Sequence, residues 1–153
     1  MKITRDGVSE LYGAITEALA EKDPKIKFDT QLKLIPNKHR IKVAYDEIEE
    51  TAKSANTELE ELKTKYCKKT VNEDGKEVAA TITGANGGVK YLGLAKGECP
   101  EYDAEAKKVL DALIAYGKGE IEIEIVPIEE KDLPRTVRGL VTEQLMRLIE
   151  TKE

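Results

Sequence analysis

A regular run of apolar residues between positions 41 and 66 restricts what this chain can fold into. Its members lie alternately four and three positions apart, which is the 3.5-residue period of an a/d seam between packed helices. Charged residues fill most of the positions in between. The pattern predicts one long helix near residues 38–69, whose seam consists of Ile41, Tyr45, Ile48, Ala52, Ala55, Leu59, Leu62 and Tyr66.

Such a seam requires a partner, because a helix of about 30 residues is about 45 Å long and cannot leave its apolar stripe in water. Two partners fit the pattern. The stripe packs either against other helices of the same chain, expected at 8–21 and 136–149, or against a second copy in a coiled-coil homo-oligomer. Ala52 and Ala55 make the middle of the seam thin, which permits close helix approach but contributes less apolar burial.

The remaining segments predict a mixed fold. Helical periodicity covers residues 6–69, interrupted near Pro36-Asn37, and returns at 101–117 and 135–150. An Asn72-Glu-Asp-Gly75 turn predicts a hairpin within 70–94, and alternating Ile and Glu residues predict a strand at 119–128. We therefore expect a single α+β domain over residues 1–153. It is mainly helical, with the long helix in an antiparallel helical assembly and a small antiparallel β-sheet formed by 70–94 and 119–128.

Charge restricts the ligands that the chain can take. The net charge is −5, which disfavours general DNA binding because nonspecific affinity for nucleic acid comes from neutralising phosphates. Within this acidic chain, residues 22–42 form a locally basic segment. A small anion or an acidic partner is the ligand such a segment predicts. The candidate ligand-binding residues are Lys33, Lys38, His39, Arg40 and Lys42.

Catalytic patterns are missing from the sequence. His39 is the single histidine and lies between two cations, so it has no acidic group beside it to orient it as a general base. Two cysteines and one histidine do not supply the four ligands of a structural zinc site. The glycines at 84–88 lack the Gly-Lys-Ser/Thr ending of a phosphate loop. The glutamates of the 119–128 strand fit a solvated sheet face. We expect no catalytic residue, no metal and no cofactor.

The chain is also expected to stay in the cytoplasm. Its N-terminal residues contain no apolar region typical of a signal peptide. No apolar run approaches the length that crosses a bilayer, so no membrane partner is predicted. Cys67 and Cys99 are expected to be reduced thiols.

The order of these features resembles a known family. A long charged helix ends in Leu62-Lys-Thr-Lys-Tyr66, and an Asn72-Glu-Asp-Gly75-Lys turn follows it. A helix with Leu110-Asp-Ala-Leu113-Ile comes next, then Glu120-Ile-Glu-Ile-Glu-Ile-Val-Pro127-Ile with Glu129 and Leu133, and a C-terminal leucine-bearing helix. This arrangement is similar to DUF1617, a family of small phage and prophage proteins of unknown function. Residues 78–100 resemble an insertion into that pattern. The resemblance implies a phage origin and a location in the host cytoplasm.

Three functions remain open at this point. The first is a non-enzymatic phage accessory protein of the anti-defence type, which inhibits a host factor or sequesters a small anionic signal in the basic segment. The second is a structural or tail-associated virion component that assembles through the seam. The third is a metal-dependent hydrolase that uses the glutamates near 120–132. The expected partners are therefore the chain itself, a host protein or a small anionic ligand.

Overall fold

The computed structural model describes residues 1–20, 28–133 and 139–149. Its internal contacts divide the chain into two compact units, Met1–Glu50 with Tyr116–Glu153, and Thr51–Ala115. They are called here the terminal unit and the central unit. The sequence predicts that the two units fold as a single domain, and this stays a prediction.

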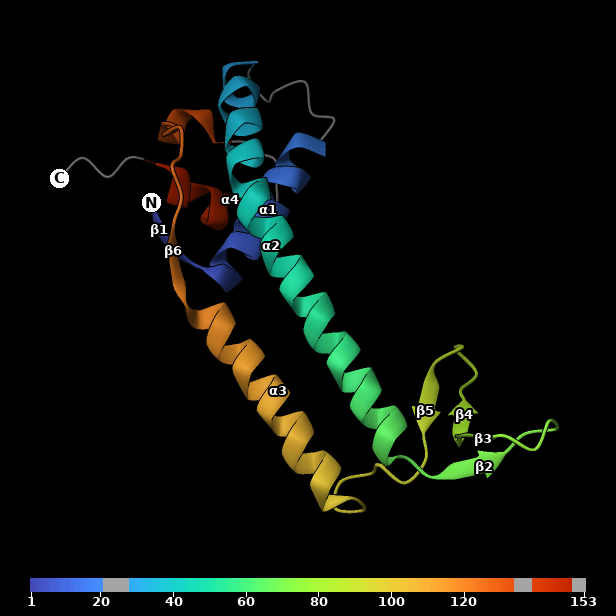
Figure 1. Cartoon of the computed structure of the whole chain (residues 1–153). Coiled ribbons are helices and arrows are strands. Elements are labelled where there is room, and N and C mark those ends of the chain that lie inside the picture. The colour runs from blue at the N-terminus through green and yellow to red at the C-terminus, as the bar shows by residue number, and fades with distance from the viewer. Residues whose placement is uncertain (21–27, 134–138, 150–153) are drawn as a thin grey trace. The chain divides into compact units, whose positions relative to one another are not determined.

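The elements are mainly helical, and the expected α+β class is confirmed (Figure 1). The helices are α1 (Arg5–Ala20), α2 (Phe28–Tyr66), α3 (Pro100–Lys118) and α4 (Gly139–Leu145), with 3₁₀ turns at Glu130–Asp132 and Met146–Leu148. The strands are β1 (Lys2–Thr4), β2 (Lys69–Val71), β3 (Glu77–Ala79), β4 (Thr81–Thr83), β5 (Val89–Tyr91) and β6 (Glu120–Glu122). The predicted helix at 135–150 is described only from residue 139 onward.

Helix α2 is longer than the sequence predicts, because the expected interruption at Pro36-Asn37 does not occur. Proline lacks an N–H group and clashes with the preceding turn, which costs roughly 3 kcal/mol inside a helix. Here the neighbouring residues offset that cost. Leu34 and Asn37 are both fully buried, and the Asn37 side-chain amide donates to the carbonyl of Lys33 at 2.9 Å. Burial on either side of Pro36 therefore keeps the helix continuous.

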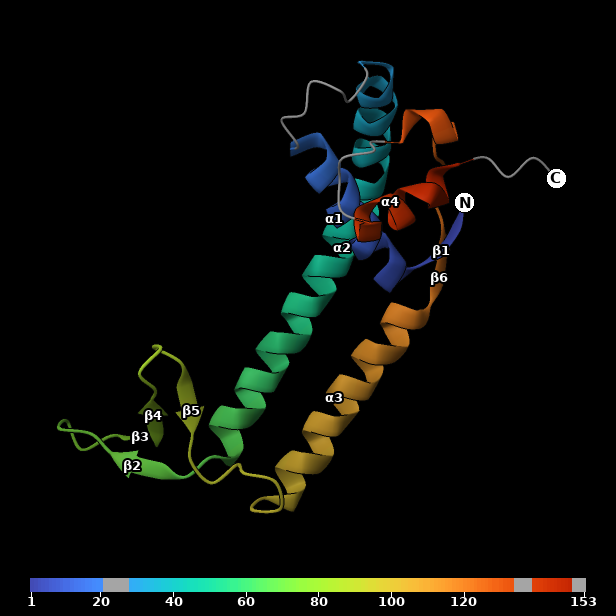
Figure 2. The ribbon, with the colours of Figure 1, turned by 180° about the vertical axis from the view of Figure 1, so that it is seen from behind.

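The terminal unit contains a well-formed apolar core. Helix α1 supplies Val8, Leu11 and Ile15 at helical spacing, all of them fully buried. Helix α4 packs against α1, and Figure 2 shows the two helices side by side from behind. The buried members of this core are Ile3, Val8, Leu11, Ala14, Ile15, Ala18, Leu34, Ile41, Ile123, Ile128, Val141, Leu145 and Leu148.

A narrow ribbon closes this unit. Strand β1 pairs antiparallel with β6, with Ile3 opposite Ile121. The Met1 ammonium donates to the Ile123 carbonyl at 2.8 Å, and the chain continues in extended form until the Ile128 N–H donates to the Leu148 carbonyl at 3.0 Å. The prediction that 119–128 shares a sheet with 70–94 is wrong. The N-terminal strand supplies the pairing edge instead, with Lys2 opposite Glu122 and Thr4 opposite Glu120.

The central unit carries two β-hairpins after α2. The Asp-Gly turn predicts the first of them, whereas the residues expected to form one strand at 76–82 divide between β3 and β4, which belong to separate two-stranded sheets. Strand β2 pairs with β3, and β4 pairs with β5. Gly75 takes a φ of 76°, a left-handed value that favours glycine and closes the first turn. Three backbone hydrogen bonds join the hairpin bases in a ring, from Lys68 to Leu92, from Leu92 to Ala80 and from Ala80 to Lys68, at 2.8–2.9 Å.

The terminal core yields a stability prediction. Replacing Leu11 by Ala removes a fully buried side chain, and such changes cost roughly 2–5 kcal/mol of unfolding free energy. Urea unfolding followed by circular dichroism measures the loss. The control is Val43→Ala on the exposed side of α2, where the side chain is 74% exposed and the change stays within about 0.5 kcal/mol. Equal losses in the two variants would contradict this location of the core.

Candidate functional site

The predicted basic residues lie on α2 and are distributed over more than one face of the helix. Lys33 and Arg40 are seven residues apart and share one face of the helix, whereas Lys38 and Lys42 share another. His39 is exposed. The predicted Lys22, Lys25 and Lys27 of the same segment lie outside the described residues.

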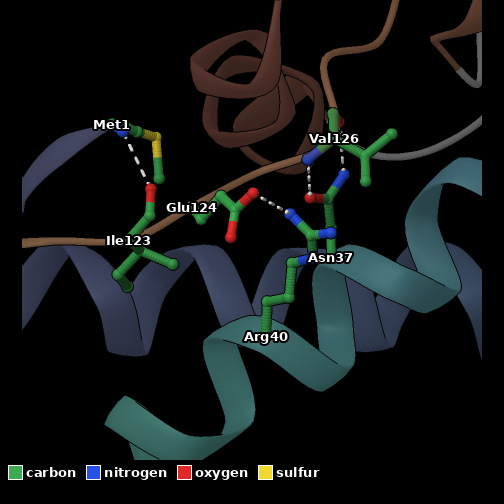
Figure 3. Close-up of polar contacts among 6 residues, drawn as sticks. All are labelled: Met1, Asn37, Arg40, Ile123, Glu124 and Val126. Carbon is green, nitrogen blue, oxygen red and sulfur yellow. Dashed lines mark hydrogen bonds and ion pairs between the residues drawn. The ribbon is translucent and has the colours of Figure 1, made fainter.

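Acidic partners already neutralise two of these cations. The Arg40 guanidinium lies 3.5 Å from the Glu124 carboxylate, as Figure 3 shows. Lys42 donates to Asp46 one helical turn away at 2.5 Å, and this hydrogen bond raises the pKa of the Lys42 ammonium. Both pairs are substantially exposed, so each contributes little to stability. An anion approaching this segment would compete with the carboxylates already bound.

A buried amide beside the basic segment has a clear structural role, and sequence reasoning did not identify it. Asn37 is fully buried. Its side chain donates to the Val126 carbonyl and accepts from the Val126 N–H, both at 2.7 Å (Figure 3). An extended segment has unpaired backbone groups, and a side-chain amide can satisfy one donor and one acceptor at once. Asn37 therefore fixes the segment after β6 to the N-terminal third of α2.

The other face of the basic segment contacts aromatic residues. The rings of Tyr12 and Tyr45 stack with centroids 4.1 Å apart, and the Lys38 ammonium lies 5.6 Å from the Tyr12 ring centroid. Burial, followed by the nearby Glu49 carboxylate, raises the pKa of the Tyr45 hydroxyl. The stacked rings join α1 to α2, so these two tyrosines contribute to helix packing.

The seam residues divide between the units. Ile41 is fully buried in the terminal core, and Tyr45 and Ile48 pack against that core. Intramolecular packing of the seam is thus present at this end. In the central unit the remaining members are only half-buried, namely Ala52, Ala55, Leu59, Leu62 and Tyr66. Assembly of copies through this half stays a prediction.

Apolar burial is scarce in the central unit. Cys67 and Ala106 are the buried apolar residues of this unit, all of whose residues are described. On α3, Leu110 is 46% exposed and Ile114 is 55% exposed, one turn apart on the same face. The hairpins expose further large side chains, namely Val71, Val78, Ile82 and Val89.

A small pocket in the central unit combines cations with aromatic rings. It has a volume of about 200 Å³ and is lined mainly by Lys63, Val89, Lys90, Tyr91, Leu94 and Tyr102. Lys63 donates to one oxygen of Glu60 at 2.6 Å, and the Tyr91 hydroxyl donates to the other at 3.1 Å. These bonds lower the pKa of the Glu60 carboxyl, and the bond to Glu60 raises the pKa of the Lys63 ammonium. No motif in the sequence predicts this pocket, because its residues come from α2, β5, the loop after β5 and α3.

The described residues offer no arrangement for metal chemistry. They contain no group of three His, Cys, Asp or Glu side chains placed to hold an ion. Of the strand glutamates, Glu120, Glu122 and Glu124 are exposed, and Glu124 faces Arg40. The glycines at 84–88 form the β4–β5 turn, in which the Gly84 N–H donates to the Gly88 carbonyl at 2.7 Å. None of the described helices combines the length and apolarity needed to cross a bilayer.

Comparison with known proteins finds no matching family model, no similar curated protein and no similar solved structure. The resemblance to the phage family therefore stays a prediction.

The Asn37 contacts lead to a second prediction. Asn37→Leu keeps the volume but leaves the Val126 N–H and carbonyl without partners, and each buried group left unpaired costs roughly 1–3 kcal/mol. We expect a lower unfolding free energy in urea. Asn56→Leu, at an exposed position of the same helix, is the matched control and should change little. If both variants unfold at the same urea concentration, Asn37 does not hold the segment.

Proposed function

We propose that this chain is a binding protein without chemistry of its own, and that its central unit engages a protein partner. The observation that carries the proposal is the imbalance in apolar burial. The terminal unit holds the core cluster, whereas the central unit buries only Cys67 and Ala106 and exposes six of the eleven exposed large apolar side chains of the described residues. Complete burial of one such side chain is worth about 1.5–3 kcal/mol, and a partner that covers this surface gains part of that free energy.

Strand geometry in the central unit supports a protein as the partner. Both hairpins are two-stranded sheets, so each of β2, β3, β4 and β5 has one edge without a strand neighbour. An open edge presents unpaired N–H and carbonyl groups that an extended segment of another protein can complete. The apolar pair Leu110 and Ile114 on α3 adds a second point of contact in the same unit.

The nature of the partner follows from the resemblance. If the chain is a phage accessory protein, the partner that we propose is a bacterial host protein in the cytoplasm, and the chain inhibits it in the manner of an anti-defence protein. The absence of a metal-binding cluster from the described residues gives the hydrolase alternative no support.

Substitutions in α3 test this proposal. Leu110→Glu with Ile114→Glu places two charges on the exposed face and should abolish capture of a stoichiometric partner from bacterial lysate, because burying an unpaired charge is costly. The matched control is Val43→Glu with Leu140→Glu, at positions 74% and 71% exposed in the terminal unit. It should capture as much partner as the unchanged chain. Retention of the partner by the α3 variant would contradict the proposal.

Assembly of copies is the second candidate, and it is favoured by the half-buried seam between Ala52 and Tyr66. It corresponds to the structural or tail-associated role. Sedimentation equilibrium separates it from the first. The principal proposal predicts a monomer of 17.0 kDa at micromolar concentration. A defined oligomer that Leu59→Lys dissociates would favour assembly instead.

Sequestration of a small anion by the basic segment makes a separate prediction. Lys38→Glu together with Arg40→Glu reverses two charges on α2 and should abolish binding if that segment is the site. Because Lys38 and Arg40 belong to the terminal unit, we expect partner capture by the central unit to survive this double change. Loss of partner capture in this variant would indicate that the basic segment is the binding surface.

A further inference from the structure

The pocket of the central unit has a chemistry that protein docking does not require. Three different elements bring its polar residues together: Lys63 comes from α2, Lys90 and Tyr91 come from β5, and Tyr102 comes from α3. The ring of hydrogen bonds at the hairpin bases fixes β5 beside the end of α2. The pocket is therefore built by tertiary structure within this unit.

The cations retain capacity to bind an anion. Lys63 donates to Glu60, and an ammonium has three N–H donors, so that pair does not exhaust it. Its side chain is 34% exposed, which leaves it within reach of a ligand. Lys90 is exposed on β5 and has no ion pair with any acidic group in the described part of the chain. The positive charge at the pocket is thus shared between a partly paired lysine and an unpaired one.

The aromatic residues give the pocket a second selectivity. Tyr91 and Tyr102 both line it and are half-buried, and the Lys63 ammonium lies 6.0 Å from the Tyr91 ring centroid. Aromatic faces beside cations favour planar rings, which stack on the former while their anionic groups meet the latter. Val89 and Leu94 add apolar walls.

The size of the pocket limits the ligand. Its volume of about 200 Å³ is below the range of sites for drug-sized ligands, which favours a small ligand with a single ring system.

We propose that this pocket binds a small planar organic anion, namely an aromatic ring carrying a phosphate or carboxylate group. The site is distinct from the basic segment of α2, and it is independent of the protein-binding surface on the α3 face. A chain with both features binds a protein and senses a small molecule in the same unit.

The test uses the full chain, with adenosine 5′-monophosphate or phenyl phosphate as the intact probe. Inorganic phosphate and adenosine, the two halves of adenosine 5′-monophosphate, are the comparison ligands. Nuclear magnetic resonance of the tyrosine ring protons reports binding. We expect saturable shifts for two tyrosines with at least one of the intact probes, and at least fivefold weaker binding of either half. Absence of saturable shifts with both intact probes, or equal binding of the halves, would overturn the proposal.

Variants distinguish this pocket from a general charge effect. Lys90→Gln and Tyr102→Leu should each weaken probe binding at least fivefold, with the helical circular dichroism unchanged. The control is Lys107→Gln on the same helix as Tyr102, where the side chain is 74% exposed and lies outside the pocket lining. It makes the same charge change and should leave affinity within twofold. Equal weakening by Lys107→Gln would show that net charge alone attracts the probe.

Discussion

This protein has few apolar side chains with which to build a core, and the rest of the structure depends on where they are buried. The chain has one Phe and no Trp, and charged residues make up 36% of it. Nearly all of the buried aliphatic residues gather in the terminal unit. Because stability derives mainly from apolar burial, a segment with little of it keeps its shape through backbone hydrogen bonds and contributes little free energy of its own. The central unit is such a segment, and its open strand edges and exposed aliphatic residues remain available for binding.

The terminal unit also depends on one polar interaction. Asn37 lies fully buried beside a proline in the N-terminal third of a long helix, and it satisfies both backbone groups of Val126. This amide joins the first and last parts of the sequence, because the segment that it holds runs from β6 to the contact between Ile128 and Leu148. A buried polar group with all partners satisfied specifies one arrangement of the chain, whereas apolar packing alone tolerates several.

Local patterns predicted most elements correctly, and long-range contacts explain what they missed. The period of the seam predicted the body of α2, and Asp-Gly predicted the first hairpin. Pro36 predicts a break because the effect of proline on a helix is local, whereas the burial of Leu34 and Asn37 that offsets this effect depends on residues far along the chain. The pairing of β1 with β6 joins residues more than a hundred positions apart. The pocket at Lys63 and Tyr102 was missed for the same reason, since its residues share no motif.

The candidate ligand-binding residues also show that residues close together in the sequence need not point in the same direction. Five basic or imidazole side chains between 33 and 42 form a cluster in the sequence, but a helix distributes them around its axis and places Glu124 against Arg40. Charge density along a chain does not equal charge density in space. The binding surfaces that we propose lie instead in the central unit, where apolar and aromatic groups remain exposed.

Amide hydrogen exchange of the free chain, followed by mass spectrometry, tests the central claim most directly, because exchange reports the free energy of local opening. Unequal apolar burial predicts that amides in α1 and in the first half of α2 up to Ile48 exchange at least about tenfold more slowly than those at 69–91. Equal or greater protection at 69–91 would show that the hairpins are stabilised as firmly as the core. That result would contradict the assignment of the central unit as the part of the chain that gains stability from a partner.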